Sequence, residues 1–204
     1  MPAPTDRAVQ SRERILDAAT TAFAEAGFAG ARIEKIAHAA RVNVQMIYYH
    51  FASKENLYRE VLRAALEQVA AAVGAAESVA PAHQAQTALR AFAQVLIAQP
   101  RFSAILIHEV MGGAEHALVL YDADPSLFDR VHGVAQRAFE QTVAAGQFRA
   151  LPPRSALLVL TMAVAAVVGG TRGLPLFYRG DSPPQDSELH GLVLDVVMNG
   201  LLLR

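Results

Sequence analysis

Apolar residues recur at steps of three and four positions along most of the chain, and this helical periodicity constrains the fold more than any other feature of the sequence. The first such stripe consists of Ile15, Leu16, Ala19, Phe23 and Ala26. No segment sustains the alternation of apolar and polar residues that is typical of a half-buried strand. The sequence therefore predicts an all-α fold.

Glycine, proline and capping residues divide the periodic segments into about nine helices. Residues 1–51 hold three helices of about 18, 8 and 7 residues. We expect Gly27 to end the first of them. Asn43 and Ser53 are expected to cap the third and fourth, because their side-chain oxygens can accept hydrogen bonds from free backbone N–H groups. The fourth helix is predicted at 53–76, five more at 83–99, 101–113, 125–145, 153–169 and 187–203, and the longest loop at 171–187.

The composition excludes several classes of protein. Of the 204 residues, 53% are hydrophobic and 18% charged, which suits a sizeable core and not a disordered chain. Cysteine is absent, so disulfides, thiol nucleophiles and thiolate metal sites are excluded. The formal net charge is −1, whereas a strongly positive net charge is typical of proteins that bind nucleic acid. The charge is uneven, however, since residues 1–59 contain eight Lys or Arg against six Asp or Glu.

The sequence does not predict a membrane segment. The longest apolar stretch, residues 156–168, is shorter than the roughly 20 residues that span a bilayer. Basic residues occur near the N-terminus, but no unbroken apolar run follows them, so we do not expect a signal peptide. These features favour a cytoplasmic protein with no membrane partner.

The second and third predicted helices are short and joined by a tight turn, which is typical of a helix-turn-helix. In that motif one helix crosses the phosphate backbone and the next lies in the major groove of DNA. Ile47 and Phe51 share one face of the third helix and would hold it to the first two. Two tyrosines and a histidine, at 48–50, are left for the outside, where DNA would cover their exposed apolar surface.

The residues of this segment resemble the TetR/AcrR family of bacterial transcriptional regulators. The resemblance runs through residues 14–19, 23, 27–28, 33–37, 40–43 and 47–58, the last of which read I-Y-Y-H-F-A-S-K-E-N-L-Y. It covers about the first 60 residues, and beyond them only architecture and length are similar. The resemblance implies a homodimeric repressor without a cofactor, associated with the nucleoid of a bacterium and released from a palindromic operator by an unknown small-molecule effector.

Two residues depart from the family pattern. Arg41 stands where the family usually has a glycine, and the left-handed conformation that glycine accepts costs other residues roughly 1 kcal/mol or more. Ala31 replaces the usual threonine, so we expect the second helix to lack that N-cap. Arg32, beside it, could contact a phosphate instead.

The residues expected to contact DNA lie on or beside the third helix. Tyrosine hydroxyls, His50 and Lys54 can donate to phosphate oxygens, whereas Gln45 and Val44 are candidates for contacts with base edges. Packing is the alternative for Tyr48 and Tyr49, and an exposed surface position is the alternative for Lys54. The full set is Arg32, Asn43, Val44, Gln45, Tyr48, Tyr49, His50 and Lys54.

A ligand pocket is expected in the rest of the chain. Polar residues in apolar helices must be paired or face a cavity, and structural pairing is the alternative for each of them. The candidate pocket residues are His108, Glu109, Met111, Phe128 and His132. No histidine pair has the spacing of a metal site, and no catalytic motif is present, so we expect neither a metal site nor an enzyme.

The last two predicted helices are more apolar than one small domain can bury, which favours a dimer interface across a two-fold axis. The residues assigned to it are Leu157, Leu160, Val164, Leu192, Val193 and Val196. Ordinary core packing within one chain is the alternative.

The sequence thus predicts a DNA-binding domain at 1–51 and a ligand-binding and dimerisation domain at 52–204, connected by the fourth helix. Double-stranded DNA, a small-molecule effector and a second copy of the chain are the expected partners. Two alternatives stay open at this point. One is a ligand-binding or interaction module that has lost specific DNA reading, and the other is an all-α enzyme that uses the apolar cavity.

Overall fold

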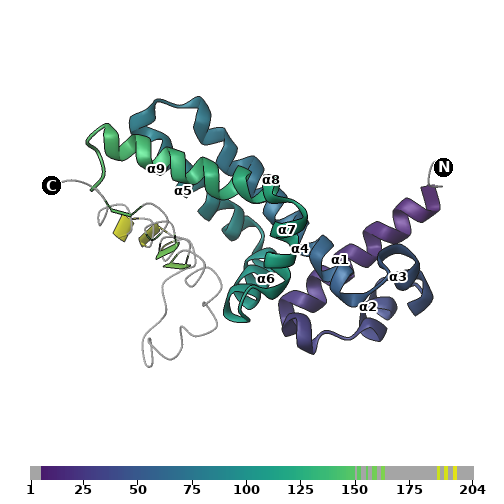
Figure 1. The fold of residues 1–204 in the computed structure, drawn as a ribbon. Helices are drawn as coiled ribbons and strands as arrows, with labels where there is room; N and C mark the ends of the chain where they lie inside the picture. Colours follow the sequence, from purple (N-terminus) through teal and green to yellow (C-terminus); the bar gives the residue numbers. More distant parts are fainter. Residues whose placement is uncertain are drawn as a thin grey trace, which may run out of the picture. The chain divides into compact units, whose positions relative to one another are not determined.

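The fold is seen in a computed structural model. It describes residues 6–149 together with 151–152, 155, 158–159, 162–163, 188, 191–192 and 195–196. Every regular element among these residues is a helix (Figure 1), which confirms the predicted all-α fold. None of the helices in this part of the chain is both long enough and apolar enough to cross a membrane.

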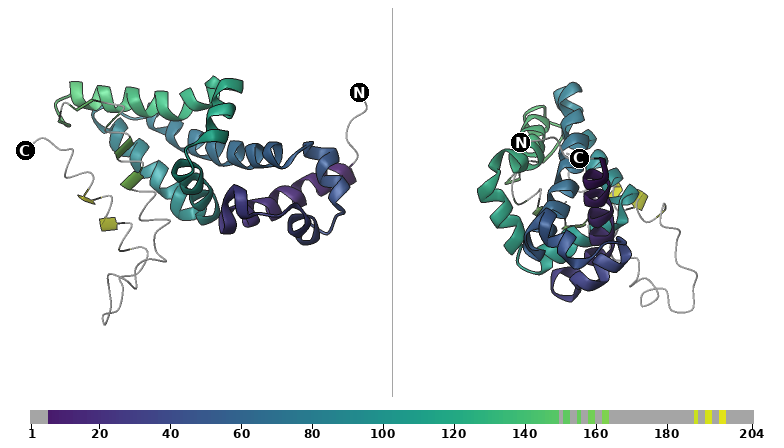
Figure 2. Two further views of the ribbon diagram at one scale, coloured as in Figure 1. Left: turned by 60° about the horizontal axis from the view of Figure 1, so that its bottom comes forward. Right: turned by 90° about the vertical axis from the view of Figure 1, so that its right-hand side faces the viewer.

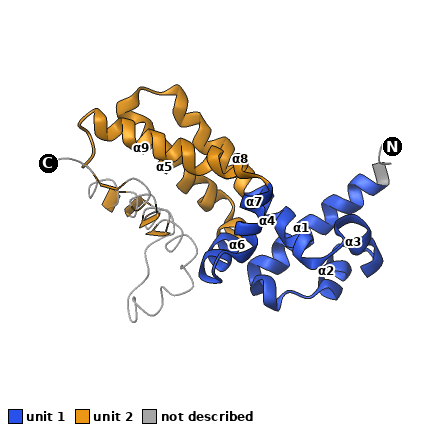
Figure 3. Ribbon diagram, viewed as in Figure 1, with its two compact units in different colours: residues 1–65, 104–123 blue, residues 66–103, 124–204 orange. Residues whose placement is uncertain are grey.

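The helices group into two compact units, which Figure 3 distinguishes by colour. The first unit comprises residues 1–65 and 104–123, and the second comprises 66–103 and 124–204. The boundaries fall within α4 (Lys54–Gly74) and α6 (Pro100–Met111), two helices that each contribute to both units. The functional division after residue 51 stays a prediction.

The first unit is built around α1 (Asp6–Gly30), α2 (Ile33–Ala39) and α3 (Val44–Phe51), which gather at the N-terminal end of the chain in Figure 1. The first part of α4, the second part of α6 and α7 (Glu115–Ala123) complete it. Its core is made of fully buried side chains from several of these helices, including Ile15, Phe23, Ile36, Ile47 and Leu57.

The predicted caps of this unit are confirmed, whereas the end predicted for the first helix at Gly27 is a break within α1, which continues to Gly30. Gly27 interrupts α1 with φ 65°, a left-handed conformation that glycine adopts without strain. Asn43 caps α3, because its Oδ1 accepts the Met46 N–H at 2.9 Å. Ser53 caps α4 by accepting the Asn56 N–H at 3.1 Å. The N-cap of α2 is Arg32, which makes no side-chain capping bond, as the replacement of threonine by Ala31 led us to expect.

The second unit contains the end of α4, the 3₁₀ turn η1 (Ala75–Ser78), α5 (Pro81–Ala98), α8 (Pro125–Phe128), the π-helical turn η2 (Asp129–Gly133) and α9 (Val134–Ala144). Helices α5 and α9 run side by side (Figures 1 and 2). Thr142 Oγ1 ties them, since it lies 3.1 Å from the Pro81 carbonyl oxygen and accepts the Ala85 N–H at 3.3 Å.

The helix boundaries after residue 80 agree with the predictions, apart from one helix. The predicted helices at 83–99 and 101–113 are α5 and α6, and the one at 125–145 is α8, η2 and α9 in succession. Helix α7 was not predicted, because Leu118 and Val119 are exposed and its nine residues show no clear apolar face. Where the structure describes residues of the predicted helices at 153–169 and 187–203, they are helical, and the loop at 171–187 lies outside the described residues.

Candidate nucleic-acid interface

The turn between α2 and α3 holds the two helices in a fixed arrangement. Its backbone is closed by hydrogen bonds from Arg41 N to His38 O at 3.1 Å and from Val42 N to Ala37 O at 3.0 Å. Arg41 has φ 54°, so this arginine does adopt the left-handed conformation for which the family uses glycine. The strain of about 1 kcal/mol is borne by a turn whose two flanking helices are anchored by buried Ile36 and Ile47.

Helix α3 divides into a buried face and an outer face, as predicted. Ile47 and Phe51 are buried, whereas Gln45, Tyr48 and Tyr49 are exposed. Tyr49 is 77% exposed, more than any other large hydrophobic or aromatic residue among the described part of the chain. Large aromatic rings in water are unfavourable unless a partner covers them, so this face has the character of a binding surface.

The other predicted DNA-contact residues surround this outer face. Arg32 and Asn43 are exposed, and Val44, His50 and Lys54 are half-buried. Lys54 lies at the start of α4 with its Nζ 4.7 Å from the centre of the Phe28 ring, a cation–π arrangement. Its ammonium group is therefore held in place by α1, and the sequence had not indicated this contact.

His50 is tied to α1 as well as belonging to α3. Its Nε2 lies 2.8 Å from the Ser11 hydroxyl, and the Tyr49 ring packs edge-on against the imidazole at 5.1 Å. Partial burial and the nearby Arg12 guanidinium hold the pKa of His50 below its usual range. At neutral pH the imidazole is therefore uncharged, and it positions the end of α3 against α1.

The candidate pocket residue Glu109 is buried and fully engaged within the first unit. It is 6% exposed, and its carboxylate accepts the Ala117 N–H at 2.7 Å and lies 3.4 Å from His116 Nδ1. The Tyr58 hydroxyl also donates to it, and burial, the nearby Glu109 charge and this bond raise the pKa of Tyr58. His116 packs against the rings of Phe28 and Tyr58, with centroids 4.2 and 4.8 Å away. We call Phe28, Tyr58, Glu109 and His116 the Glu109 cluster.

The other four candidate pocket residues are not brought into this cluster. His108 is exposed, and its ring faces Gly27, where an added Cβ would lie 3.5 Å from Nδ1. Met111 is 75% exposed. Phe128 and the exposed His132 belong to the second unit, where their rings stack with centroids 6.1 Å apart. A role for these residues in ligand binding stays a prediction.

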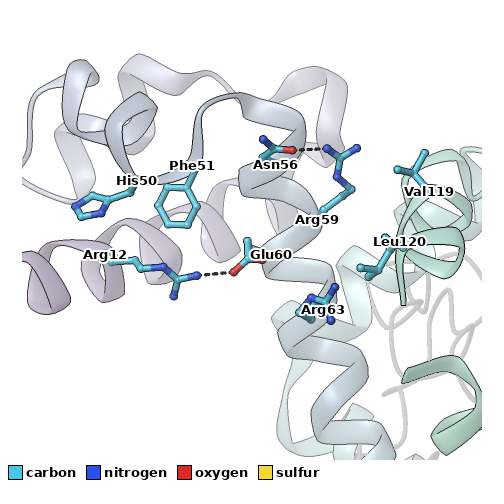
Figure 4. A pocket seen from close by; sticks show the side chains of 10 residues that line it. Arg12, His50, Phe51, Asn56, Arg59, Glu60, Arg63, Val119 and Leu120 are labelled. Carbon is cyan, nitrogen blue, oxygen red and sulfur yellow. Dashed lines mark hydrogen bonds and ion pairs between the residues drawn. The ribbon is translucent and has the colours of Figure 1, made fainter. Parts of the chain in front are cut away.

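A cavity of about 460 Å³ lies in the first unit, and none of the five candidate pocket residues lines it (Figure 4). Several of its lining residues come from one face of α4, at steps of three and four residues, namely Asn56, Arg59, Glu60 and Arg63. This polar face of α4 was not predicted from the sequence, although the spacing of its residues is visible there. His, Asp and Glu side chains do not gather into a metal-binding group of three or more in the described part of the chain.

Two of the six residues assigned to the dimer interface are described, Leu192 and Val196. Both are helical and exposed, by 57% and 61%. The other four, Leu157, Leu160, Val164 and Val193, lie outside the described residues.

Comparison with known proteins agrees with this geometry. The model of a family described as bacterial regulatory proteins, tetR family, matches residues 15–61. The HTH-type transcriptional repressor NicS of Pseudomonas putida is 35% identical over 149 residues, which cover 70% of this chain and 68% of that protein. The HTH-type transcriptional regulator RutR of Escherichia coli is 36% identical over 110 residues, which cover 53% of this chain and 52% of RutR.

Solved structures share the fold over nearly the whole chain. A regulatory protein of the tetR family from Rhodococcus RHA1 superposes with a TM-score of 0.74 at 19% identity, covering 95% of this chain and 98% of the other. The ketosteroid transcriptional regulator KstR2 of Mycobacterium tuberculosis superposes with a TM-score of 0.71 at 20% identity, covering 99% and 98%. At these identities the likeness establishes the fold alone.

The helix-turn-helix and these relatives together define a DNA-binding transcriptional regulator. The chain belongs to the tetR family of bacterial regulatory proteins, which confirms the resemblance drawn from the sequence. The matched proteins are regulators and not enzymes. Regulators of this family bind DNA operators and small-molecule effectors and form dimers.

Proposed function

We propose that this protein is a homodimeric repressor of the bacterial cytoplasm that binds a palindromic operator and leaves it when a small-molecule effector binds. The observation that carries the DNA-binding part is the outer face of α3. It presents Tyr48, Tyr49 and Gln45 to solvent from a short helix whose opposite side is anchored in the core. The name of NicS, a transcriptional repressor, supports the direction of regulation.

In this proposal Gln45 and Val44, at the N-terminal end of α3, contact base edges in the major groove. A glutamine amide can pair with the N6 and N7 positions of adenine, and the valine methyl groups can contact thymine. The phosphate contacts come from Arg32, Asn43, Tyr48, Tyr49 and Lys54, the polar residues around the outer face of α3. Phosphate contacts of this kind fix the orientation of the domain on the duplex.

His50 has a second task in this arrangement. Its bond to Ser11 and its lowered pKa make it a neutral link between α3 and α1. The Ser11 hydroxyl donates to the Ala8 carbonyl oxygen, so the neutral imidazole donates its Nε2–H to Ser11 and has no second N–H for a phosphate. His50 could contact a phosphate only when it is protonated, and we expect its main contribution to come from positioning α3.

Exposed apolar residues near the C-terminus support the homodimer. Leu192 and Val196 are one helical turn apart and both largely exposed. A second copy of the chain related by a two-fold axis would cover them. Two tethered DNA-binding domains would then read two half-sites separated by about one helical turn, 10–10.5 base pairs.

The Glu109 cluster offers a route by which an effector could change DNA binding. Glu109 on α6 and His116 on α7 contact Tyr58 on α4 and Phe28 at the end of α1, all within the first unit. A movement of α6 would therefore displace α4, which carries Lys54, and α1, which supports α3. Because half-site spacing is fixed by the DNA, a shift of a few ångströms is sufficient to lose binding.

Selection of binding sites from random double-stranded DNA by the full-length protein tests the proposal. We expect an enriched sequence made of two inverted half-sites about 10 base pairs apart centre to centre. A single half-site would contradict the homodimer. Recovery of no enriched sequence would favour the alternative in which the chain has lost specific DNA reading.

A further inference from the structure

The cavity of about 460 Å³ in the first unit is rich in positive charge (Figure 4). Arg12 of α1 and Arg59 and Arg63 of α4 line it. Glu60 is the one acidic residue of the lining. Guanidinium groups stay charged at any physiological pH, so cationic side chains outnumber carboxylates here and the cavity favours an anion.

The opposite wall of the same cavity is apolar. It consists of Val119, Leu120 and Ala123 on α7, and Figure 4 shows the Val119 and Leu120 side chains facing the arginines of α4. Val119 is 46% exposed although it is a large apolar residue. The volume lies within the range of about 300–1,000 Å³ that is typical of small-molecule pockets. A ligand that fits both walls has an anionic end and a hydrocarbon part.

Two of the three arginines, Arg12 and Arg59, are held in position by other residues of the lining. Arg12 forms an ion pair with Glu60 and lies 5.3 Å from the centre of the Phe51 ring. Arg59 donates a hydrogen bond to Asn56 on the preceding turn of α4. Side chains that are already ordered lose less conformational entropy when a ligand binds. The arginine side chains of the cavity can therefore pair with a planar anion that accepts two parallel hydrogen bonds, and a carboxylate has this geometry.

We propose that this cavity binds a small organic carboxylate and that its occupation weakens operator binding. The carboxylate-binding part of the proposal depends on the cavity alone, whereas the effect on operator binding rests on the proposed function. The carboxylate would pair with Arg63 and Arg59, and its hydrocarbon part would contact Val119 and Leu120. This site is distinct from the pocket predicted around His108 and His132, because no residue of that set lines it.

The expected direction of the effect follows from charge. The cavity touches His50 and Phe51 at the end of α3, so a bound carboxylate adds a negative charge next to the helix that faces DNA. The added charge reduces the attraction between this weakly basic segment and the phosphate backbone. Since binding linkage is reciprocal, operator DNA must weaken carboxylate binding by the same factor.

Binding of a carboxylate in the cavity is tested without DNA. The full-length protein is titrated with sodium octanoate, sodium benzoate or inorganic phosphate, and its backbone amide signals are followed by NMR. We expect both carboxylates to saturate, to shift the signals of Phe51, Leu120 and Ala123, and to bind more tightly than phosphate. Arg63→Gln is expected to weaken them by roughly tenfold or more, because it removes a charge-assisted hydrogen bond. The control is Arg90→Gln, which changes an exposed arginine of α5 and should have no effect.

Ala123→Asp provides a second variant that does not depend on an arginine. Ala123 is exposed, so the substitution should be tolerated by the fold, and the new carboxylate should repel the ligand. The absence of saturable carboxylate binding, equal binding of phosphate, or binding that neither Arg63→Gln nor Ala123→Asp weakens would overturn the proposed site.

Operator affinity measured with and without octanoate tests whether the bound carboxylate weakens operator binding. We expect octanoate to lower operator affinity in the wild type and less in Arg63→Gln. Octanoate that binds the free protein but leaves operator affinity unchanged would overturn the regulatory half while the site itself stands. If no operator is found at all, the proposed function fails, and the NMR titration still decides whether the site exists.

Discussion

The outer face of α3 and the Glu109 cluster lie in the same compact unit but use aromatic and polar side chains in opposite ways. On α3, Tyr48 and Tyr49 are 48% and 77% exposed. In the cluster, Tyr58 is 1% exposed and the carboxylate of Glu109 is 6% exposed, with every contact made to other residues of the unit. Exposed rings contribute little to folding stability and are available to a binding partner. Buried polar groups must instead form their hydrogen bonds within the protein.

This contrast means that substitutions in the two regions should affect different quantities. A change on α3 should alter DNA binding and leave the free energy of unfolding almost unchanged. A change in the cluster should lower the free energy of unfolding first and affect DNA binding only through the position of the helices.

Glu109→Ala should lower the free energy of unfolding by about 2–4 kcal/mol, because it leaves the Ala117 N–H and the Tyr58 hydroxyl without their acceptor in the interior. Urea denaturation followed by circular dichroism measures the change. Glu67→Ala, at an exposed position of α4, is the matched control and should stay within about 0.5 kcal/mol of the wild type. A Glu109→Ala protein as stable as this control would show that the cluster does not support the fold.

Tyr49→Ala should weaken operator binding by roughly tenfold or more, the loss expected for a hydrogen bond to a charged phosphate group. The free energy of unfolding should hardly change, because the ring is mostly exposed. Fluorescence anisotropy of labelled operator DNA and urea denaturation provide the two readouts. Leu118→Ala, which removes an exposed apolar side chain from α7 instead of α3, should leave both unchanged. A Tyr49→Ala protein that loses folding stability but keeps its operator affinity would contradict the assignment of Tyr49 to DNA binding.

Lys54→Ala distinguishes a phosphate contact from packing on Phe28, since the ammonium group lies 4.7 Å from that ring. A phosphate contact in each protomer predicts that the slope of log affinity against log salt becomes shallower by about 1.8 per dimer, at about 0.9 for each phosphate. Loss of the cation–π contact alone predicts a stability loss of about 0.5–1 kcal/mol with an unchanged slope. Operator titrations at several salt concentrations separate the two, and an unchanged slope would remove Lys54 from the DNA contacts.

His50 should produce the smallest effect, and it depends on pH. The pKa of His50 is lowered in the folded protein by burial and by Arg12, so the folded state binds this proton less tightly than the unfolded state does. The stability associated with the neutral imidazole is present above the unfolded pKa of about 6.5 and is lost as the pH falls through the lower folded pKa. His50→Gln should reduce the fall in unfolding free energy between about pH 7 and pH 5. An identical pH profile in both proteins would contradict this assignment.

The contrast between the regions also explains what the sequence could predict. The helix-turn-helix is encoded within a short continuous segment, where the caps Asn43 and Ser53 and the buried pair Ile47 and Phe51 are all visible as local spacing. The left-handed Arg41 could be expected because it stands where the resembled family usually has a glycine.

The Glu109 cluster could not be predicted in the same way, because its members come from four helices and are separated by up to 88 positions along the chain, from Phe28 to His116. The sequence showed that Glu109 needed a partner or a cavity, but not which. Helix α7 was missed, and with it His116 and the apolar wall of the cavity. Local periodicity indicates helices, whereas contacts between distant segments depend on how these helices pack.

Whether the outer face of α3 reads DNA sequence can be measured by comparing the binding sites selected by the wild type and by Gln45→Ala. Gln45 is exposed and lies in the first turn of α3, so its loss should relax the base preference at one position of each half-site, at a cost of about 1–3 kcal/mol for the preferred base. The other positions of the site should keep their preferences. An identical selected sequence for both proteins would contradict the assignment of Gln45 to base reading.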